Sequence, residues 1–178
     1  MRIISGKHKS KRINAPHNLP VRPTTDMAKE ALFNILNNSY YFDQISVVDL
    51  FAGIGSISFE FASRGTENII SVDKNRGCVK FLEKTGKELD IDIQVLKSDA
   101  FTFLEKTSSK FDVIFADPPY DLPQDQFYKI AELVFERNLL NDDGMLIVEH
   151  SKFTDLSGHK AFVNSRKYGS NIFSFFKK

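Results

Sequence analysis

From residue 45 onward, the chain alternates short apolar runs with stretches of helical periodicity. Five of the runs are rich in apolar residues, which is typical of strands that are buried on both faces of a parallel sheet. They comprise residues 45–50, 68–73, 91–99, 111–117 and 145–150. Helices packed on both faces of one sheet are the arrangement that buries such strands.

The end of the chain departs from this alternation. Residues 160–169 and 171–178 carry two further strand patterns, joined by a tight Gly-Ser turn. Because no helix separates these strands, they must pair antiparallel. The sequence therefore predicts an α/β fold, a doubly wound, mostly parallel seven-stranded sheet that ends in an antiparallel hairpin. A sheet of this kind binds its ligand at the carboxyl ends of the parallel strands.

The segments before and between the predicted parallel strands have helical spacing. The first, within residues 22–36, has Thr24, Thr25 or Asp26 as its expected N-cap. The other expected helices comprise residues 57–65, stopped by Gly65, then 75–90, 100–108 and 125–140, the last ended by an Asn-Asp-Asp-Gly turn at 141–144.

The first 22 residues are basic, although the whole chain has a formal net charge of only +1. This segment contains no acidic residue and has no firm periodicity beyond a short Arg-Ile-Ile-Ser run. We expect a basic arm at residues 1–20, able to contact phosphates, followed by one domain at residues 21–178. A solvated tail without a partner is the alternative interpretation of the arm.

Composition narrows the class of protein further. A length of 178 residues suits a single domain with one substantial core. The single cysteine, Cys78, excludes an internal disulfide and argues against a zinc site built on cysteine pairs. No apolar run approaches the roughly 18 residues of a membrane span, and the basic N-terminus lacks the apolar segment of a signal peptide. We therefore expect a cytoplasmic protein without membrane contact.

Four predicted strands each deliver an aspartate at their carboxyl end. These residues are Asp49, Asp73, Asp99 and Asp117. One such aspartate would be explained by a turn or a helix cap, where aspartate is common. Four at equivalent places indicate a binding crevice into which the carboxylates converge.

The turn after the first strand is rich in glycine. Gly53 and Gly55 let the backbone approach a ligand closely, and the next helix offers free N–H groups to an anion. Ser58 stands where a dinucleotide fingerprint would have its third glycine. Asp73, 18 residues beyond Gly55, lies where a carboxylate accepts hydrogen bonds from ribose hydroxyls, and Asp99 is placed to accept from an adenine amine. The pattern predicts an adenosine-containing cofactor but does not choose among such cofactors.

The fourth strand ends in Asp117-Pro118-Pro119-Tyr120. The two prolines fix two φ angles and remove two backbone donors, which makes a rigid corner. The Asp117 carboxylate and the Pro118 carbonyl can each accept a hydrogen bond from one planar amine, and Tyr120 can stack on the attached ring. A turn that merely ends a strand is the competing explanation.

This tetrapeptide resembles the signature of class I S-adenosylmethionine-dependent methyltransferases that modify nucleobase amines. The order and spacing of several further segments are similar to those of RsmD-type enzymes, which methylate a guanine N2 in bacterial 16S rRNA. These segments are the N-terminal MRIISGKHKSKRI, then RPTTDMAKEALFNIL, DLFAGIGSISFE, SRG and the late KYG. The resemblance covers nearly the whole chain.

The resemblance implies S-adenosylmethionine as cofactor and rRNA in a small ribosomal subunit or assembly intermediate as partner. The chemistry requires no metal and the sequence suggests none, and a monomer is the default expectation. It implies target-amine contacts by Asp117, Pro118, Pro119 and Tyr120. Expected cofactor contacts are Asp49, Phe51, Ala52, Gly53, Gly55, Asp73, Lys74, Asp99 and Ala100. Expected RNA contacts are Lys7, Lys9, Lys11, Arg12, Arg22, Thr24 and Thr25.

Three other functions stay open from the sequence. The same chemistry could act on adenine N6 or cytosine N4 of DNA, although the chain has no room for a separate recognition domain. An NAD-binding oxidoreductase would share the crevice, but the third glycine and a catalytic His or Lys near it are missing. A non-catalytic RNA-binding module could use the same fold.

Overall fold

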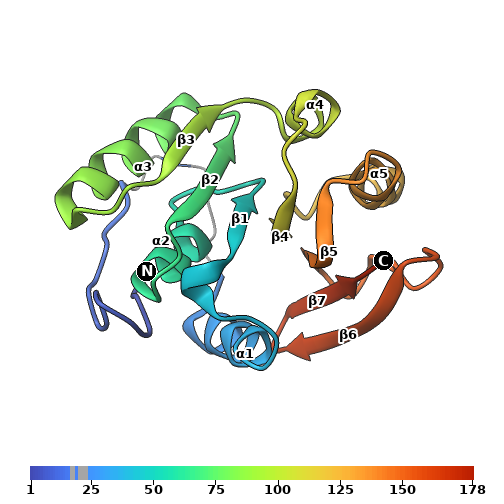
Figure 1. Cartoon of the computed structure of the whole chain (residues 1–178), viewed down its shortest axis with the longest axis horizontal. Helices are drawn as coiled ribbons and strands as arrows, with labels where there is room; N and C mark the ends of the chain where they lie inside the picture. The colour runs from blue at the N-terminus through green and yellow to red at the C-terminus, as the bar shows by residue number, and fades with distance from the viewer. Residues whose placement is uncertain (17–18, 20–23) are drawn as a thin grey trace.

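The chain folds around one seven-stranded sheet with the strand order β3-β2-β1-β4-β5-β7-β6 (Figure 1). The computed structural model describes residues 1–16, 19 and 24–178. Strands β1 to β5 are parallel, and β7 pairs antiparallel with both β5 and β6. The strands are β1 (Ser46–Asp49), β2 (Asn68–Asp73), β3 (Gln94–Lys97), β4 (Phe111–Ala116), β5 (Leu140–His150), β6 (Phe162–Tyr168) and β7 (Asn171–Phe176). The predicted fold class is confirmed.

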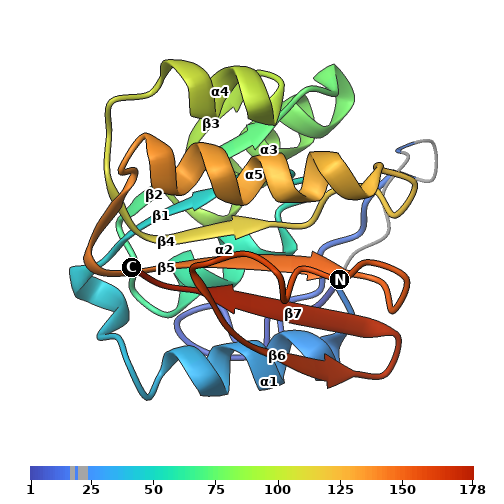
Figure 2. The ribbon, with the colours of Figure 1, turned by 90° about the vertical axis from the view of Figure 1, so that its right-hand side faces the viewer.

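Helices cover both faces of the sheet, so successive strand residues are buried on opposite sides. Figure 2 shows α4 and α5 on one face of the sheet and α1 on the other. Val48 and Ile114 pack with α4 and α5, whereas Val47 and Val113 pack with α1 and α2. This double burial explains the uninterrupted apolar runs of the central strands. The helices are α1 (Asp26–Leu36), α2 (Ser56–Ser63), α3 (Arg76–Leu89), α4 (Ala100–Lys106) and α5 (Gln124–Glu136), with a 3-10 turn η1 at Phe42–Gln44.

The predicted end of the helix at residues 125–140 and the turn at 141–144 are wrong. Helix α5 ends at Glu136, because Asn138 adopts a left-handed conformation with φ 54°. The Leu139 amide then donates to the Val134 carbonyl at 3.0 Å, the hydrogen bond that closes a Schellman motif. Residues 140–144 continue into β5, where a register shift against β4 accommodates them.

The first 16 residues pack against the domain. Ile3 and Ile13 are buried in a cluster with side chains of α2 and α3. Within α2, Glu60 accepts hydrogen bonds from the amides of Ile4 at 2.7 Å and Ser5 at 3.1 Å. The N-terminal segment is therefore fixed to α2 in the protein alone, while the division into an arm at 1–20 and a domain at 21–178 stays a prediction.

In the described part of the chain, no helix has both the length and the apolar character that a membrane span requires. The carboxyl ends of β1, β2 and β4 lie along one edge of the sheet, because these strands are neighbours and parallel. The β6–β7 turn comes to the same edge, since Ile172 near the start of β7 pairs with His150 at the end of β5. This edge carries the cavity described next.

Candidate active site

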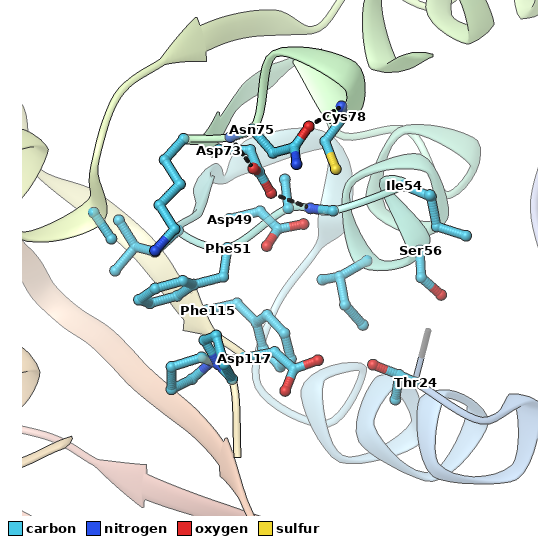
Figure 3. A pocket seen from close by; sticks show the side chains of 18 of the residues that line it. Thr24, Asp49, Phe51, Ile54, Ser56, Asp73, Asn75, Cys78, Phe115 and Asp117 are labelled. Atoms are coloured by element: carbon cyan, nitrogen blue, oxygen red, sulfur yellow. Dashed lines mark hydrogen bonds between the residues drawn. The ribbon is translucent and has the colours of Figure 1, made fainter. Parts of the chain in front are cut away.

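A cavity of about 550 Å³ opens at the carboxyl edge of the parallel strands (Figure 3). Its volume lies in the range of small-molecule and cofactor sites. All four aspartates that follow the strands line it, as the topology predicts. The predicted site residues found in its wall are Thr24, Asp49, Phe51, Ala52, Gly53, Asp73, Lys74, Asp99, Ala100, Asp117, Pro118, Pro119 and Tyr120.

Asp73 is tied to the glycine turn that it faces. Its Oδ2 accepts from the Gly53 amide at 2.8 Å, and its Oδ1 accepts from the Asn75 amide at 2.7 Å. Gly53 adopts φ +54°, which a residue without a Cβ adopts with little strain. Each carboxylate oxygen keeps further acceptor capacity, so Asp73 can hold the turn and still receive a ligand hydroxyl.

Gly55 is outside the residues that line the cavity. It has φ +79°, and a Cβ added there would lie 2.6 Å from both the Phe59 ring and the Leu82 side chain. This glycine is thus required where α2 begins and packs against α3. Packing explains Gly55 without the cofactor contact that the sequence predicts.

Asp49 is buried at the base of the cavity, with a relative exposure of 2%. Its Oδ2 accepts from Ser58 Oγ at 2.7 Å, and Ser58 Oγ in turn accepts from Ser71 Oγ at 2.7 Å. Burial raises the pKa of Asp49 to about 7, against the opposing effect of the Ser58 hydrogen bond. A cationic ligand group beside it would restore the charged form.

Asp99 has a structural task in addition to its place in the cavity wall. Its Oδ1 accepts from the amides of Phe101 at 3.0 Å and Thr102 at 3.1 Å, so it is the N-cap of α4. The cap orients the carboxyl group at the rim where Ala100 begins the helix. The alternative considered for each aspartate, a helix cap, therefore holds for Asp99 without removing it from the site.

Asp117 follows β4 directly and points into the cavity (Figure 3). Burial raises the pKa of its carboxyl group well above the usual range, and the nearby carboxylates of Glu149 and Asp49 add to the effect. Pro118 is buried, and Tyr120 is 41% exposed at the mouth of the cavity. A strong hydrogen-bond acceptor thus lies inside and an aromatic ring lies at the entrance.

Comparison with known proteins assigns the family. The model described as "Conserved hypothetical protein 95" matches residues 1–177. The chain belongs to this family. The match confirms the resemblance to RsmD-type enzymes that the sequence indicates.

Three known proteins illustrate the relationship. The chain is 33% identical to the "Putative rRNA methyltransferase YlbH" of Bacillus subtilis, over 100% of this chain and 99% of that one. It is 30% identical to the "Ribosomal RNA small subunit methyltransferase D" of Haemophilus influenzae, over 85% and 79%. The structure of the Thermus thermophilus 16S rRNA N2 G1207 methyltransferase RsmC with AdoMet and guanosine superposes with a TM-score of 0.70 at 22% identity, over 90% of this chain and 45% of that one. The last likeness supports the class I methyltransferase fold.

Sequence reasoning missed Glu149, a buried carboxylate at the end of β5 next to Asp117. Thr24 Oγ1 donates to its Oε2 at 3.0 Å, and Asn171 Nδ2 donates to its Oε1. Glu149 thereby joins the start of α1 to the start of β7, two segments that lie far apart in the sequence. The available signal was an acidic residue inside the apolar run Met-Leu-Ile-Val-Glu-His, where only a bonded carboxylate is tolerated.

The predicted RNA contacts fall into three groups. Lys7, Lys9, Lys11 and Arg12 are on the N-terminal segment and do not line the cavity. Thr24 lines it, whereas Thr25 accepts from the Ala28 amide at 3.2 Å as N-cap of α1. Arg22 lies outside the described residues.

No cluster of three or more His, Cys, Asp or Glu side chains that could hold a metal ion is found in residues 1–16, 19 and 24–178. The four aspartates line one cavity, and the Asp49 carboxylate is close enough to Asp117 to add to the effect of burial on its pKa. The arrangement offers carboxylates to a ligand that carries positive charge and hydroxyl groups.

Proposed function

We propose that this protein transfers a methyl group from S-adenosylmethionine to the exocyclic N2 amine of a guanine in 16S rRNA. Two relatives that are 30% or more identical over at least 85% of this chain are named as rRNA methyltransferases, and the RsmC structure of the same fold holds AdoMet and guanosine. The observation that carries the proposal is the cavity that brings Asp117-Pro118-Pro119-Tyr120 together with Asp49, Asp73 and Asp99.

The cavity suits the proposed cofactor in both size and charge. A volume of about 550 Å³ accommodates a nucleoside with an amino-acid extension. Asp49 would hold the cationic methionine end, Asp73 the ribose hydroxyls and Asp99 the adenine amine, while Phe51, Ala52, Gly53, Lys74 and Ala100 would complete the wall. When bound, S-adenosylmethionine supplies an electrophilic methyl group on a sulfonium.

The residues after β4 would prepare the amine. A nucleobase amine is a weak nucleophile, because its lone pair is delocalised into the ring. Two acceptors, the Asp117 carboxylate and the Pro118 carbonyl, would bind its two N–H groups, favour a pyramidal nitrogen and stabilise the positive charge that develops on it. Tyr120 would fix the plane of the base by stacking. The rigid prolines keep these groups in place before the reaction.

The acidic surroundings of Asp117 would add to this effect. Burial, and after it the carboxylates of Glu149 and Asp49, raise the pKa of Asp117, so its carboxylate accepts hydrogen bonds strongly and can take up the proton that the methylated amine releases. The raised pKa also implies that turnover falls as the pH is lowered and Asp117 becomes protonated, because a protonated carboxyl group loses acceptor capacity.

The setting of the reaction is part of the proposal. The cations Lys7, Lys9, Lys11 and Arg12 would contact rRNA phosphates, and Thr24 and Thr25 would shape the rim where the target base enters. The substrate would be a small ribosomal subunit or an assembly intermediate, and the protein would act as a cytoplasmic monomer.

The test compares small-subunit rRNA from cells with and without the protein by mass spectrometry. We expect one N2-methylguanine to disappear when the gene is deleted and to return when it is restored. An unchanged pattern of guanine methylation contradicts the proposal. The same measurement identifies the modified nucleotide.

A second test examines Asp117 with purified protein. Asp117→Ala should lower kcat by roughly 100- to 1000-fold, the range for loss of one preorganised hydrogen-bonding group at a reacting centre. Affinity for S-adenosylhomocysteine, measured by calorimetry, should be nearly unchanged. Asp142→Ala, on an exposed residue at the opposite end of β5, is the control and should behave as wild type. A collapse of cofactor affinity in the Asp117 variant would assign this carboxylate to the cofactor.

A further inference from the structure

The loop that follows β5 presents an aromatic ring that the proposed methyl transfer does not use. Phe153 is 85% exposed, the highest value for a large apolar side chain in the described part of the chain. A single exposed apolar residue is common on protein surfaces and needs no explanation by itself. Phe153 is of interest because its loop lies near the active site.

Strand pairing places this loop beside the target-amine residues. Strands β4 and β5 are parallel neighbours with Ala116 opposite Val148, so the chain leaves both strands at the same edge of the sheet. One exit leads into Asp117-Pro118-Pro119-Tyr120 and the other into residues 151–157. Adjacent strands lie about 4.8 Å apart, so the two loops begin side by side.

Hydrogen bonds connect the loop of residues 151–157 to the start of α5, the helix that follows the target-amine residues. Gln124, the first residue of α5, donates from Nε2 to the Asp155 carbonyl at 2.6 Å and accepts at Oε1 from the Asp155 amide at 3.1 Å. The segment between Tyr120 and Gln124 is short, so this paired contact fixes the loop of Phe153 to the mouth of the cavity. The loop of Phe153 and the loop of Tyr120 therefore both lie at the carboxyl edge of the sheet.

The loop is also held internally. The Phe153 amide donates to Ser151 Oγ at 3.3 Å, the Thr154 amide donates to the Ser151 carbonyl at 3.2 Å, and the Ser157 amide donates to Asp155 Oδ1 at 2.9 Å. Lys152 Nζ lies 5.1 Å from the centre of the Phe153 ring. The ring is thus exposed on a hydrogen-bonded loop, with a cation next to it.

We propose that Phe153 and Lys152 form a stacking site for a nucleotide adjacent to the target guanine. This inference rests on the proposed function. A base that leaves its stack to enter the cavity leaves an adjacent base with one uncovered face. An exposed aromatic ring can cover that face whatever the base identity, and a lysine beside it can contact the neighbouring phosphate. RNA is favoured over a protein partner because a ring paired with a cation suits a base joined to a phosphate.

The kinetic test uses small ribosomal subunits from cells that lack the protein. Phe153→Ala should raise KM for the subunits by roughly 5- to 100-fold, the effect of removing one base–aromatic stack, with little change in kcat or in affinity for S-adenosylhomocysteine. Phe153→Trp should keep KM near the wild-type value, and Phe153→Leu should not. The matched control is Tyr41→Ala, since Tyr41 is 77% exposed but lies before β1, away from the cavity. An unchanged KM for Phe153→Ala overturns the proposal.

A cross-linking test identifies the partner. The photoreactive residue p-benzoylphenylalanine, placed at position 153 and at control position 41, is irradiated in the presence of the same subunits. A cross-link from position 153 to an rRNA nucleotide beside the modified guanine supports the stacking site. A cross-link to a ribosomal protein, or none to rRNA, overturns it. Because this readout does not require methylation, it separates failure of the stacking site from failure of the proposed activity, which the wild-type enzyme reports.

Discussion

Replacement of Asp49 by asparagine should stabilise the protein, and the gain should depend on pH. Asp49 is 2% exposed, and burial raises the pKa of its carboxyl group from 3.8 to about 7. Between these two values the folded protein binds a proton that the unfolded chain does not hold. Stability therefore falls as the pH rises from about 4 to about 7, because the folded state must either keep a proton or bury a charge.

The size of this effect follows from the pKa shift. A tenfold change in proton affinity corresponds to about 1.4 kcal/mol, so the shift of Asp49 destabilises the folded state by about 4 kcal/mol above pH 7. At pH 5 the same linkage gives only about 1.7 kcal/mol, because Asp49 stays protonated in the folded state and forgoes only the small free energy of ionisation that the unfolded chain gains at this pH. Asparagine at this position neither holds a titrating proton nor buries a charge, so it has no pH-dependent penalty.

The variant still pairs with Ser58. The side-chain carbonyl of the asparagine in Asp49→Asn would accept from Ser58 Oγ, and any penalty for the new amide group is independent of pH. The difference in unfolding free energy between variant and wild type should therefore increase by about 2.5 kcal/mol from pH 5 to pH 8. Subtracting the difference in unfolding free energy at pH 5 from that at pH 8 removes the contributions that do not depend on pH.

Urea unfolding at pH 5 and pH 8, followed by circular dichroism, measures this difference. Asp142→Asn is the control, because Asp142 is fully exposed on β5 and should give the same small change at both pH values. If Asp49→Asn shifts stability equally at pH 5 and pH 8, the carboxyl group titrates normally and the description of the buried site is wrong. A stabilised variant with weakened cofactor binding would show that the site keeps a destabilising charge for its ligand.

Two further predictions concern the attachment of the N-terminal segment. Lys29→Met should lower the free energy of unfolding by about 3 kcal/mol, because it leaves the buried Glu60 without one of its cations. Lys84→Met, in the exposed pair with Glu88, is the control and should change it by less than about 0.5 kcal/mol. Urea titration measures both variants, and equal effects would contradict the role of burial. Gly6 has φ +82°, and in Gly6→Ala the new Cβ would lie 1.7 Å from the Ser63 carbonyl oxygen. The N-terminal segment should then detach from α2, and hydrogen exchange should show lost protection of the Ile4 and Ser5 amides. Retained protection would refute this attachment.

The sheet could be predicted from the sequence because its central strands are buried on both faces. The run 68–73 coincides with β2, whose alternate residues face the helix layers on opposite sides of the sheet. The predicted strand at 91–99 is too long, and only Gln94–Lys97 forms β3. This strand is at the edge of the sheet and pairs only with β2, so the sheet constrains fewer of its residues.

The sequence predicts the cavity residues that lie at the carboxyl ends of strands. Parallel topology brings Asp49, Asp73, Asp99 and Asp117 to one edge whatever the details of packing. Contacts between distant segments do not follow from such rules. The pairing of Thr24 with Glu149 spans 125 residues, and the sequence pattern near either residue does not identify its partner.

Two buried glutamates hold together segments around the cavity that are far apart in the sequence. A buried carboxylate is tolerated only when hydrogen bonds or cations satisfy it, so each one fixes the groups around it. Glu149 fixes Thr24, which lines the same cavity as Asp117 (Figure 3). Glu60 lies 3.8 Å from Lys29 Nζ, and the same ammonium group donates to Ser56 Oγ at 3.4 Å, another residue of the cavity wall.

The N-terminal segment is therefore coupled to the cavity through charged groups. Lys29 Nζ donates to the Arg2 carbonyl at 2.6 Å while it reaches Ser56 and Glu60, so one side chain connects the N-terminal segment, α1 and the start of α2. Burial lowers the pKa of Lys29, and the nearby Glu60 carboxylate opposes that effect. Contact of RNA with the basic N-terminal residues would act on the same structural unit that forms the wall around the cofactor.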